Sequence, residues 1–127
     1  MKGDVKSAGE IGYRNTPDVD IFQLAKLFDQ AGWQHRTRDL GRLARVVRGS
    51  MFLVSAWDGD RLVGFARAIS DGASDAQIST MVVHEDYRRK GIAKELVRRL
   101  LKGHDELAFI VDGIRGRTRI PPSPLMQ

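Results

Sequence analysis

The sequence predicts an α/β (α+β) fold, in which helices flank a mixed, mostly antiparallel central sheet. Apolar runs with strand character alternate along the chain with stretches whose apolar residues recur at helical spacing. A tight-turn signal, Asp58-Gly59-Asp60, joins two of the strand-like runs into a hairpin. A helical stretch at residues 91–102 lies between two further runs, as in a crossover between parallel neighbours. The predicted order is β-α-α-β-β-β-α-β.

The N-terminal part is predicted to form a strand at residues 11–14 and then two helices. Thr16-Pro17-Asp18 combines a capping hydroxyl, a proline at the first helical position and an acid in the first turn, so we expect the first helix to begin there and to end at Gly32. Asp39 is expected to cap a second helix, which Gly49 closes.

Four strands and one helix are expected in the rest of the domain. The strands are predicted at residues 51–57, 62–69, 77–83 and 107–111, and the helix at residues 91–102. Residues 62–69 are apolar on both faces of the expected strand, which predicts a central, covered position in the sheet.

Length and charge predict one domain with a distinct tail. The 127 residues fit a single domain, which we expect over residues 1–112. Residues 113–127 are basic and hold three prolines in four positions, which predicts an extended or disordered tail. Without residues 115–127 the chain has 18 basic and 16 acidic side chains, so much of the net charge of +5 at pH 7 belongs to the tail. The net charge is therefore no general argument for nucleic acid binding.

Composition argues against several classes of protein. The chain has no cysteine, which excludes disulfides and thiolate metal sites, and its three histidines lack the spacing of metal ligands. We therefore expect no metal. Apolar runs fall short of the ~20 residues of a membrane helix, and residues 1–10 lack the apolar segment of a signal peptide. The expectation is a cytoplasmic protein with no membrane partner.

The most informative segment runs from residue 82 to residue 94, where a strand passes through a loop into a helix. A helix start carries partial positive charge and amides without partners, so acids or hydroxyls are usual there. This start holds four cations instead, an arrangement that favours a bound anion, although a solvated basic loop is the alternative. Gly91 and the small Ala93 let such a ligand approach the backbone. The cations are Arg88, Arg89, Lys90 and Lys94.

This segment resembles the coenzyme signature of the GNAT superfamily of N-acetyltransferases. Arg88-x-x-Gly91-x-Ala93 matches its pattern of Gln or Arg, two residues, Gly, one residue, and Gly or Ala. The match follows a strand ending in Met81-Val82-Val83-His84, is preceded by Asp86-Tyr87 and opens an amphipathic helix. Residues 62–67 resemble the central strand of these enzymes. The resemblance covers roughly residues 10–111.

The resemblance implies a GNAT-like fold that binds acetyl-CoA as co-substrate. Two strands, those of residues 77–83 and 107–111, would splay apart so that the coenzyme fills the gap. Backbone groups of one strand would pair with the pantetheine arm, and amides from Arg89 through Ala93 would hold the pyrophosphate. The amide of Val82 or Val83 would polarise the thioester carbonyl. The coenzyme-binding residues implied are Met81, Val82, Val83, Arg88, Arg89, Lys90, Gly91, Ile92, Ala93 and Lys94.

The end of the chain departs from the family pattern. Members normally continue after the last predicted strand with another helix, whose tyrosine can protonate the departing thiolate, and two more strands. Nothing in residues 112–127 matches, so we expect an altered or truncated C-terminal end that lacks the usual last helix and strands. The strand at residues 107–111 is then expected to present an unpaired edge, which a homodimer would cover.

The catalytic base is not evident. In histone-type relatives a glutamate stands where this chain has Gln77, and an amide cannot act as a base. Asp71 and Asp75 are weak candidates, and loop-capping is the favoured interpretation of both. Arginines crowd the second predicted helix, which disfavours polyamines and basic peptides as acceptors and favours anionic ones, unless they form a solvated face. They are Arg36, Arg38, Arg42, Arg45 and Arg48.

Two functions remain open. The first is an N-acetyltransferase that moves an acetyl group from acetyl-CoA to a small-molecule or peptide amine by direct attack. The alternative is a non-catalytic acyl-CoA-binding or interaction domain of the same fold. A nucleic-acid-binding protein is disfavoured, because no aromatic stacking platform or known motif is present.

Overall fold

The computed structural model describes residues 10–32, 38–102, 104, 107–113 and 116–120, with residues 109–113 and 116–120 described by their backbone alone. These residues form one six-stranded sheet with the strands in chain order. The elements are β1 (Gly12–Arg14), α1 (Ile21–Gln30), α2 (Leu40–Arg48), β2 (Phe52–Asp58), β3 (Arg61–Ser70), β4 (Asp75–Val83), η3 (Glu85–Tyr87), α3 (Ile92–Leu101), β5 (Ala108–Gly113) and β6 (Gly116–Ile120).

The sheet is mixed and mostly antiparallel, as predicted. Strands β1 to β4 pair antiparallel, and β4 pairs parallel with β5. The parallel pair is joined through α3, so the predicted strand–helix–strand crossover is confirmed. The β2–β3 hairpin turns at Gly59, whose φ of 59° requires a residue that tolerates the left-handed region.

Strand β6 is an addition to the predicted order. It pairs antiparallel with β5, so the prediction that residues 107–111 leave an unpaired edge was wrong. The three prolines all follow Ile120 in the sequence, and none removes an amide from β6. Only residues 114–115 separate β5 from β6, which leaves no room between them for the helix that the family pattern normally places after β5.

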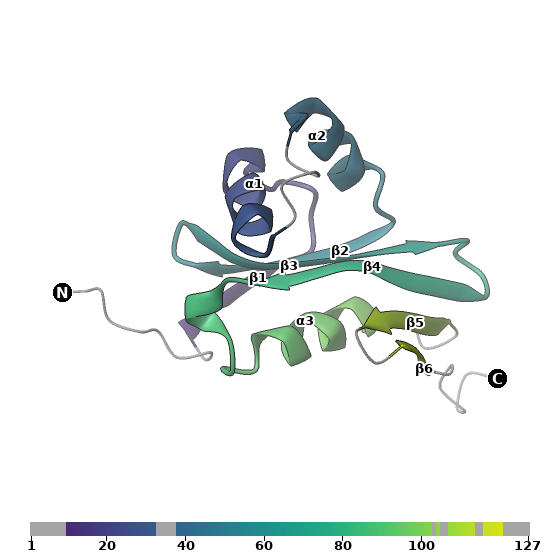
Figure 1. The fold of residues 1–127 in the computed structure, drawn as a ribbon. Coiled ribbons are helices and arrows are strands. Elements are labelled where there is room, and N and C mark those ends of the chain that lie inside the picture. Colours follow the sequence, from purple (N-terminus) through teal and green to yellow (C-terminus); the bar gives the residue numbers. More distant parts are fainter. Residues whose placement is uncertain (1–9, 33–37, 103, 105–106, 114–115, 121–127) are drawn as a thin grey trace.

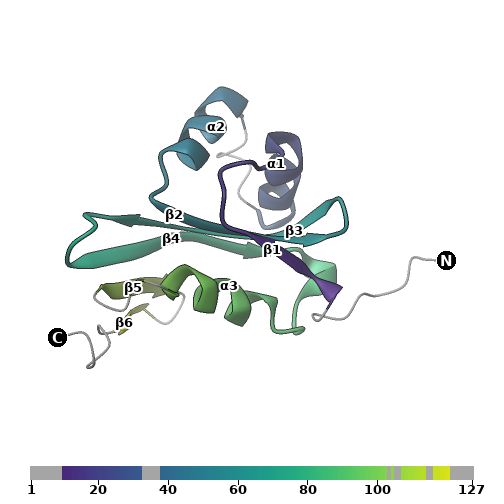
Figure 2. The ribbon, with the colours of Figure 1, turned by 180° about the vertical axis from the view of Figure 1, so that it is seen from behind.

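Helices cover both faces of the β1–β4 sheet. Figures 1 and 2 show α1 and α2 on one face and α3 on the other. The core accordingly divides into two clusters: one joins α3 to the sheet through Ile92, Leu96 and Leu100, and the other joins α1 and α2 to it through Leu24, Phe28 and Leu43. Strand β3 contributes to both clusters, with Val63 on one side and Phe65 on the other. Its predicted central position is confirmed.

Close packing of α3 depends on Gly64 in β3. A β-carbon added there would lie 3.2 Å from the Ala56 Cβ, 3.2 Å from the Ile92 Cγ2 and 3.3 Å from the Leu96 Cδ1. Any larger residue would push the helix away from the sheet. The position of the α3 N-terminus relative to β4 therefore depends on this glycine.

The first helix begins later than predicted. Thr16-Pro17-Asp18 precedes the helix, and the Val19 amide donates to the Pro17 carbonyl oxygen across a short turn. Asp20 is the N-cap instead, because its side chain accepts from the amides of Phe22 and Gln23. The second predicted cap is confirmed, since the Asp39 side chain accepts from the Arg42 amide.

Candidate functional site

Strands β4 and β5 pair along only part of β4. Their register begins at Asp75 with Ala108 and ends at Ile78 with Val111. The β3–β4 register shifts at the same place, so that Ser79 is an extra residue on β4 and forms a β-bulge. A bulge bends the strand that carries it. Among the described residues, the second half of β4 pairs with β3 alone, and its other edge is open as expected for a splayed pair.

Strand alternation identifies which backbone groups face the open edge. The His84 amide donates to the Val63 carbonyl oxygen at 2.8 Å, and successive residues of a strand point their polar groups to opposite edges. Val82 therefore faces its partner Phe65 on β3. Met81 and Val83 face the open edge. The Val83 carbonyl oxygen accepts from the Arg88 Nε at 3.1 Å, so it is already engaged.

The loop after β4 leads to a helix start that no side chain caps. Arg89 has a φ of 64°, the only positive value among the described non-glycine residues, and Gly91 has a φ of 82° as the N-cap of α3. The first hydrogen bond of the helix runs from the Glu95 amide to the Gly91 carbonyl oxygen at 3.0 Å. The amides of the first helical turn thus have no partner within the helix, and they carry the positive end of its dipole.

A cavity of about 340 Å³ lies at this helix start. A β-carbon added at Gly91 would meet no atom within 4 Å, so a ligand can approach the backbone there. Of the ten predicted coenzyme residues, seven line the cavity, whereas Met81, Val82 and Lys90 do not. Tyr87 was missed, although its place directly before the matched motif was a usable signal. The lining residues are Val83, Tyr87, Arg88, Arg89, Gly91, Ile92, Ala93 and Lys94.

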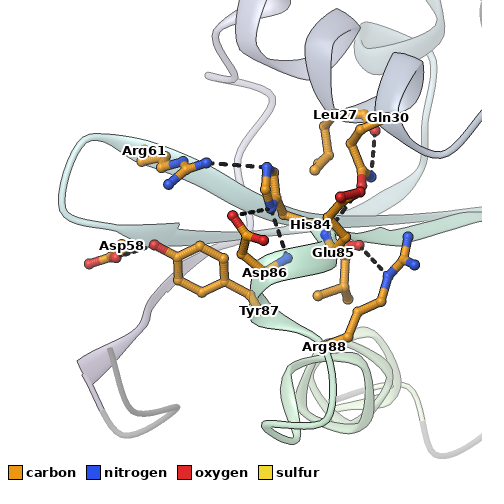
Figure 3. A network of polar contacts seen from close by, with 10 residues as sticks. Leu27, Gln30, Asp58, Arg61, His84, Glu85, Asp86, Tyr87 and Arg88 are labelled. Atoms are coloured by element: carbon orange, nitrogen blue, oxygen red, sulfur yellow. Dashed lines mark hydrogen bonds and ion pairs between the residues drawn. The ribbon is translucent and has the colours of Figure 1, made fainter. Parts of the chain in front are cut away.

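Tyr87 anchors the loop to the β2–β3 hairpin. Its hydroxyl donates to the Asp58 Oδ2 at 2.5 Å, and the Arg61 guanidinium lies over its ring, 5.5 Å from the centroid. Figure 3 shows the Tyr87 hydroxyl next to Asp58, with Arg61 above the two side chains. Burial and the bond to Asp58 raise the pKa of Tyr87, so the phenol stays protonated and keeps donating. Its role here is to hold the loop.

His84 holds the other end of the same loop. Its Nδ1 accepts from the Asp86 amide at 3.1 Å and so caps η3, while its Nε2 lies 3.2 Å from the Arg61 Nη2. Burial, followed by the positive charge of Arg61, lowers the pKa of His84. The Glu85 amide donates to the Gln30 Oε1 at 3.2 Å, which ties the loop to α1 as well (Figure 3).

A larger cavity of about 690 Å³ lies between α2 and the middle of β4. Gln77 is in its lining, next to the bulged residue Ser79 and to Thr80. Asp39 is the only acid among the described residues of this lining, and its carboxylate is already used to cap α2. The described residues of the lining are Phe28, Arg38, Asp39, Arg42, Leu43, Val46, Arg67, Gln77, Ile78, Ser79 and Thr80. Arg36 lies outside the described residues.

The two candidate bases, Asp71 and Asp75, line neither cavity. The Asp71 Oδ1 accepts from the amides of Ala73 and Ser74, each at 2.9 Å. These bonds lower the pKa of Asp71, which favours a loop cap over a base. Asp75 begins β4, at the opposite end of the strand from Val83, and accepts from the Ser74 hydroxyl at 3.0 Å. The contacts of Asp71 and Asp75 therefore favour the loop-capping interpretation of both residues.

The described residues contain no group of three or more histidine, cysteine, aspartate or glutamate side chains placed to hold a metal ion. Every helix in that part of the chain is too short or too polar to cross a membrane.

An uncapped helix start beside an open strand edge is an arrangement that can hold an anionic ligand. The chain belongs to the acetyltransferase (GNAT) family, whose model matches residues 19–110. It is 33% identical over 92 residues to the uncharacterized N-acetyltransferase ycf52 of Porphyra purpurea, a match that covers 69% of this chain and 52% of that protein.

Solved structures support the same fold. A GNAT family acetyltransferase from Streptococcus pneumoniae matches with a TM-score of 0.65 and 26% identity, over 76% of this chain and 70% of that one. The PaiA N-acetyltransferase of Thermoplasma acidophilum, solved in complex with coenzyme A, matches with a TM-score of 0.60 and 15% identity, over 80% of this chain and 77% of that one. The chain spans about half the length of the curated relatives it matches.

Proposed function

We propose that this chain is an N-acetyltransferase that binds acetyl-CoA at the start of α3 and transfers its acetyl group to an amine. The observation that carries the proposal is the cavity at that helix start, which combines uncapped amides, Gly91 and the surrounding cations beside the open edge of β4. The coenzyme A in the Thermoplasma relative supports this choice of ligand.

The residues present fit such a ligand. The amides of Ile92, Ala93 and Lys94 would hold the pyrophosphate, as helix starts commonly do. Arg88, Arg89, Lys90 and Lys94 would supply the opposite charge. The pantetheine arm, which carries amide groups, would pair with the open-edge backbone of Met81 and Val83 in the manner of an added strand.

The chemistry is a direct transfer. Acetyl-CoA supplies a thioester: the neutral amine attacks its carbonyl carbon, the C–N bond forms as the C–S bond breaks, and the departing thiolate takes up the proton that the amine releases. The Val83 amide is the group that we expect to polarise the thioester carbonyl, because Val82 points its amide to β3.

We assign to solvent, and not to a protein base, the transfer of the proton from the amine to the departing thiolate. Gln77 lines the larger cavity but cannot accept the proton, and the Asp39 carboxylate is engaged as a helix cap. We therefore expect kcat/KM to rise with pH in proportion to the neutral fraction of the amine. No enzyme group should titrate at a pH below the pKa of the amine. A bell-shaped or acid-shifted profile would point to a protein base instead.

Release of free thiol from acetyl-CoA, measured with a panel of amines, tests the function. Thiol release that depends on the amine supports an acetyltransferase. Gln77, which stands where histone-type relatives have a glutamate, favours one other candidate, a non-catalytic acyl-CoA-binding domain. Saturable binding of acetyl-CoA without release for any amine would support that candidate and overturn the first.

Three sequence predictions stay as proposals. They are the division into a domain of residues 1–112 and a tail, whose residues 116–120 form β6 at the edge of the sheet, a cytoplasmic location, and a homodimer. A dimer formed at this end of the sheet would use the outer edge of β6 in place of β5. Light scattering of the purified chain tests the dimer.

A further inference from the structure

We propose that the acceptor amine carries an anionic group, a carboxylate or a phosphate, which Arg38, Arg42 and Arg67 hold in the larger cavity. The proposal rests on the proposed function, because it assigns the acceptor of that same reaction. It concerns a different surface from the coenzyme site, and its test is separable from coenzyme binding.

Most of the charged side chains described in the cavity lining are positive. Arg38 and Arg42 flank the N-cap of α2, and Arg67 comes from β3. Against these three cations, the described part of the lining holds one carboxylate, that of Asp39, whose Oδ1 accepts from the Arg42 amide at 3.0 Å. The dipole of α2 adds further positive potential at the same place. An anion is attracted here, and a polyamine or a basic peptide is repelled.

Arg67 is held in a fixed orientation at the floor of the cavity. It is half-buried, its Nε donates to the Thr80 Oγ1 at 3.1 Å, and its Nη1 donates to the Ser50 Oγ at 3.4 Å. Both of these hydroxyls are neutral, and they help to orient the guanidinium. A guanidinium oriented in this way is suited to a carboxylate or phosphate oxygen.

Only some of the arginines on α2 and directly before it line the cavity, namely Arg42 on the helix and Arg38 just ahead of its N-cap. Arg45 and Arg48 belong to the same helix but are not in the lining of this cavity. A merely solvated basic face would make all four equivalent. The proposal makes Arg38 and Arg42 different from Arg45, which supplies a matched control on the same helix.

The cavity lies next to the proposed thioester position on the same strand. Its floor includes Ser79 and Thr80, and the open-edge residues Met81 and Val83 follow directly. At ~3.3 Å per residue, Thr80 and Val83 are about 10 Å apart along the strand. An acceptor whose anionic group binds the arginines can therefore extend its amine toward Val83.

The test compares amines that differ only in the anionic group. Thiol release from acetyl-CoA is measured with O-phosphoethanolamine against ethanolamine, and with γ-aminobutyrate against its amide. We expect kcat/KM to be about tenfold or more higher for the anionic member of at least one pair. Preference in the first pair identifies phosphate and preference in the second identifies carboxylate. Equal rates within both pairs, or a preference for spermidine, would overturn the proposal.

Variants separate the acceptor site from the coenzyme site. Arg38→Gln and Arg42→Gln should each lower kcat/KM for the preferred anionic amine about tenfold, with the neutral amine unchanged. Arg45→Gln should change neither. Arg42→Glu should reverse the preference within the pair. Equal losses for both members of a pair, or equal losses for Arg45→Gln, would contradict the assignment.

Calorimetry with acetyl-CoA is run on the same samples. All the arginine variants should bind acetyl-CoA as the unaltered chain does, because none lies at the α3 cavity. If the unaltered chain does not bind acetyl-CoA, the proposed function fails. If it binds and turns over amines without regard to their charge, the acceptor proposal fails alone.

Discussion

The Arg88 Nε donates to the Val83 carbonyl oxygen at 3.1 Å, so the first residue of the matched motif binds back to the last residue of β4. This contact closes the loop between the strand edge and the helix start. It therefore links the two halves of the proposed coenzyme site, the open backbone edge and the uncapped amides.

Removing the Arg88 donor should loosen the loop. We expect Arg88→Leu to lower the free energy of unfolding by about 1 kcal/mol, because a partly buried carbonyl loses its partner. Acetyl-CoA affinity should fall several-fold. Glutamine, which the family signature also allows here, keeps an N–H donor, so Arg88→Gln should stay close to the unaltered chain in stability. Thermal melts and calorimetry check both, and equal effects of the two variants would count against this role.

Gly91 should be essential to binding rather than to folding. Asparagine tolerates a positive φ, so Gly91→Asn should fold with a melting temperature close to that of the unaltered chain. Its side chain would project into the cavity and should weaken acetyl-CoA binding more than tenfold. Gly59→Asn is the matched control, since Gly59 also has a positive φ and nothing within 4 Å but lies in the β2–β3 turn. Undiminished binding by Gly91→Asn would refute the site.

Arg89 adopts a conformation that suits glycine. A left-handed φ costs a non-glycine residue roughly 1–2 kcal/mol, a cost that glycine does not have. Glycine also has more conformational entropy to lose on folding, and this offsets part of the stabilisation. We expect Arg89→Gly to leave stability unchanged or raise it by up to about 1 kcal/mol, whereas Arg89→Val should lower it because a β-branched residue fits the left-handed region least. Free energies of unfolding measured in urea check this order of stability. An Arg89→Gly variant that is less stable than Arg89→Val would contradict it.

Gly64 should show the cost of overpacking. Gly64→Ala places a methyl group 3.2 Å from atoms of Ala56 and Ile92 and should lower stability by roughly 1–3 kcal/mol. Gly12→Ala is the control, because the nearest atom to its added β-carbon is the Trp57 carbonyl oxygen at 4.0 Å. Similar melting temperatures for the two variants would mean that α3 is free to move away from the sheet.

His84 should make the domain less stable in mild acid. Its pKa is lowered in the folded state, so the unfolded chain takes up the proton first as the pH falls. The stability that neutral His84 contributes is complete above its ordinary pKa of ~6.5 and is lost as the pH falls through the lower folded value. An imidazolium can no longer accept from the Asp86 amide.

Paired urea unfolding curves at pH 8 and pH 5.5 measure this effect. His84→Asn, which keeps a capping oxygen but does not titrate, should lose less stability between the two pH values than the unaltered chain does. An identical loss in both proteins would assign the acid sensitivity to other groups.

The sequence predicted the fold where local signals agreed with long-range packing. Strand β3 and the motif before α3 are examples, because apolar runs and the Arg88–Ala93 pattern each have one consistent interpretation. The start of α1 was misplaced because Asp20 competes with Thr16 as a cap, and only the packed helix decides between them. Strand β6 was missed because its residues are polar and precede prolines, so its pairing depends on the presence of β5.

The candidate site was predictable only in part. The helix start and its cations follow from the motif, but the open edge of β4 depends on the bulge at Ser79, which has no sequence signature here. The lining of the larger cavity combines α2, β3 and β4. Arg38 and Arg42 were among the arginines considered for an acceptor border, whereas Arg67 becomes their neighbour only in the folded chain.

Calorimetric titration of the purified, folded chain with acetyl-CoA tests the central claim most directly. We predict saturable binding at one site per chain, weakened by salt as expected for phosphates held by cations. Gly91→Asn should greatly weaken it and Gly59→Asn should not. Absence of binding in a sample whose thermal melt is cooperative would contradict the coenzyme site, and with it the proposed function.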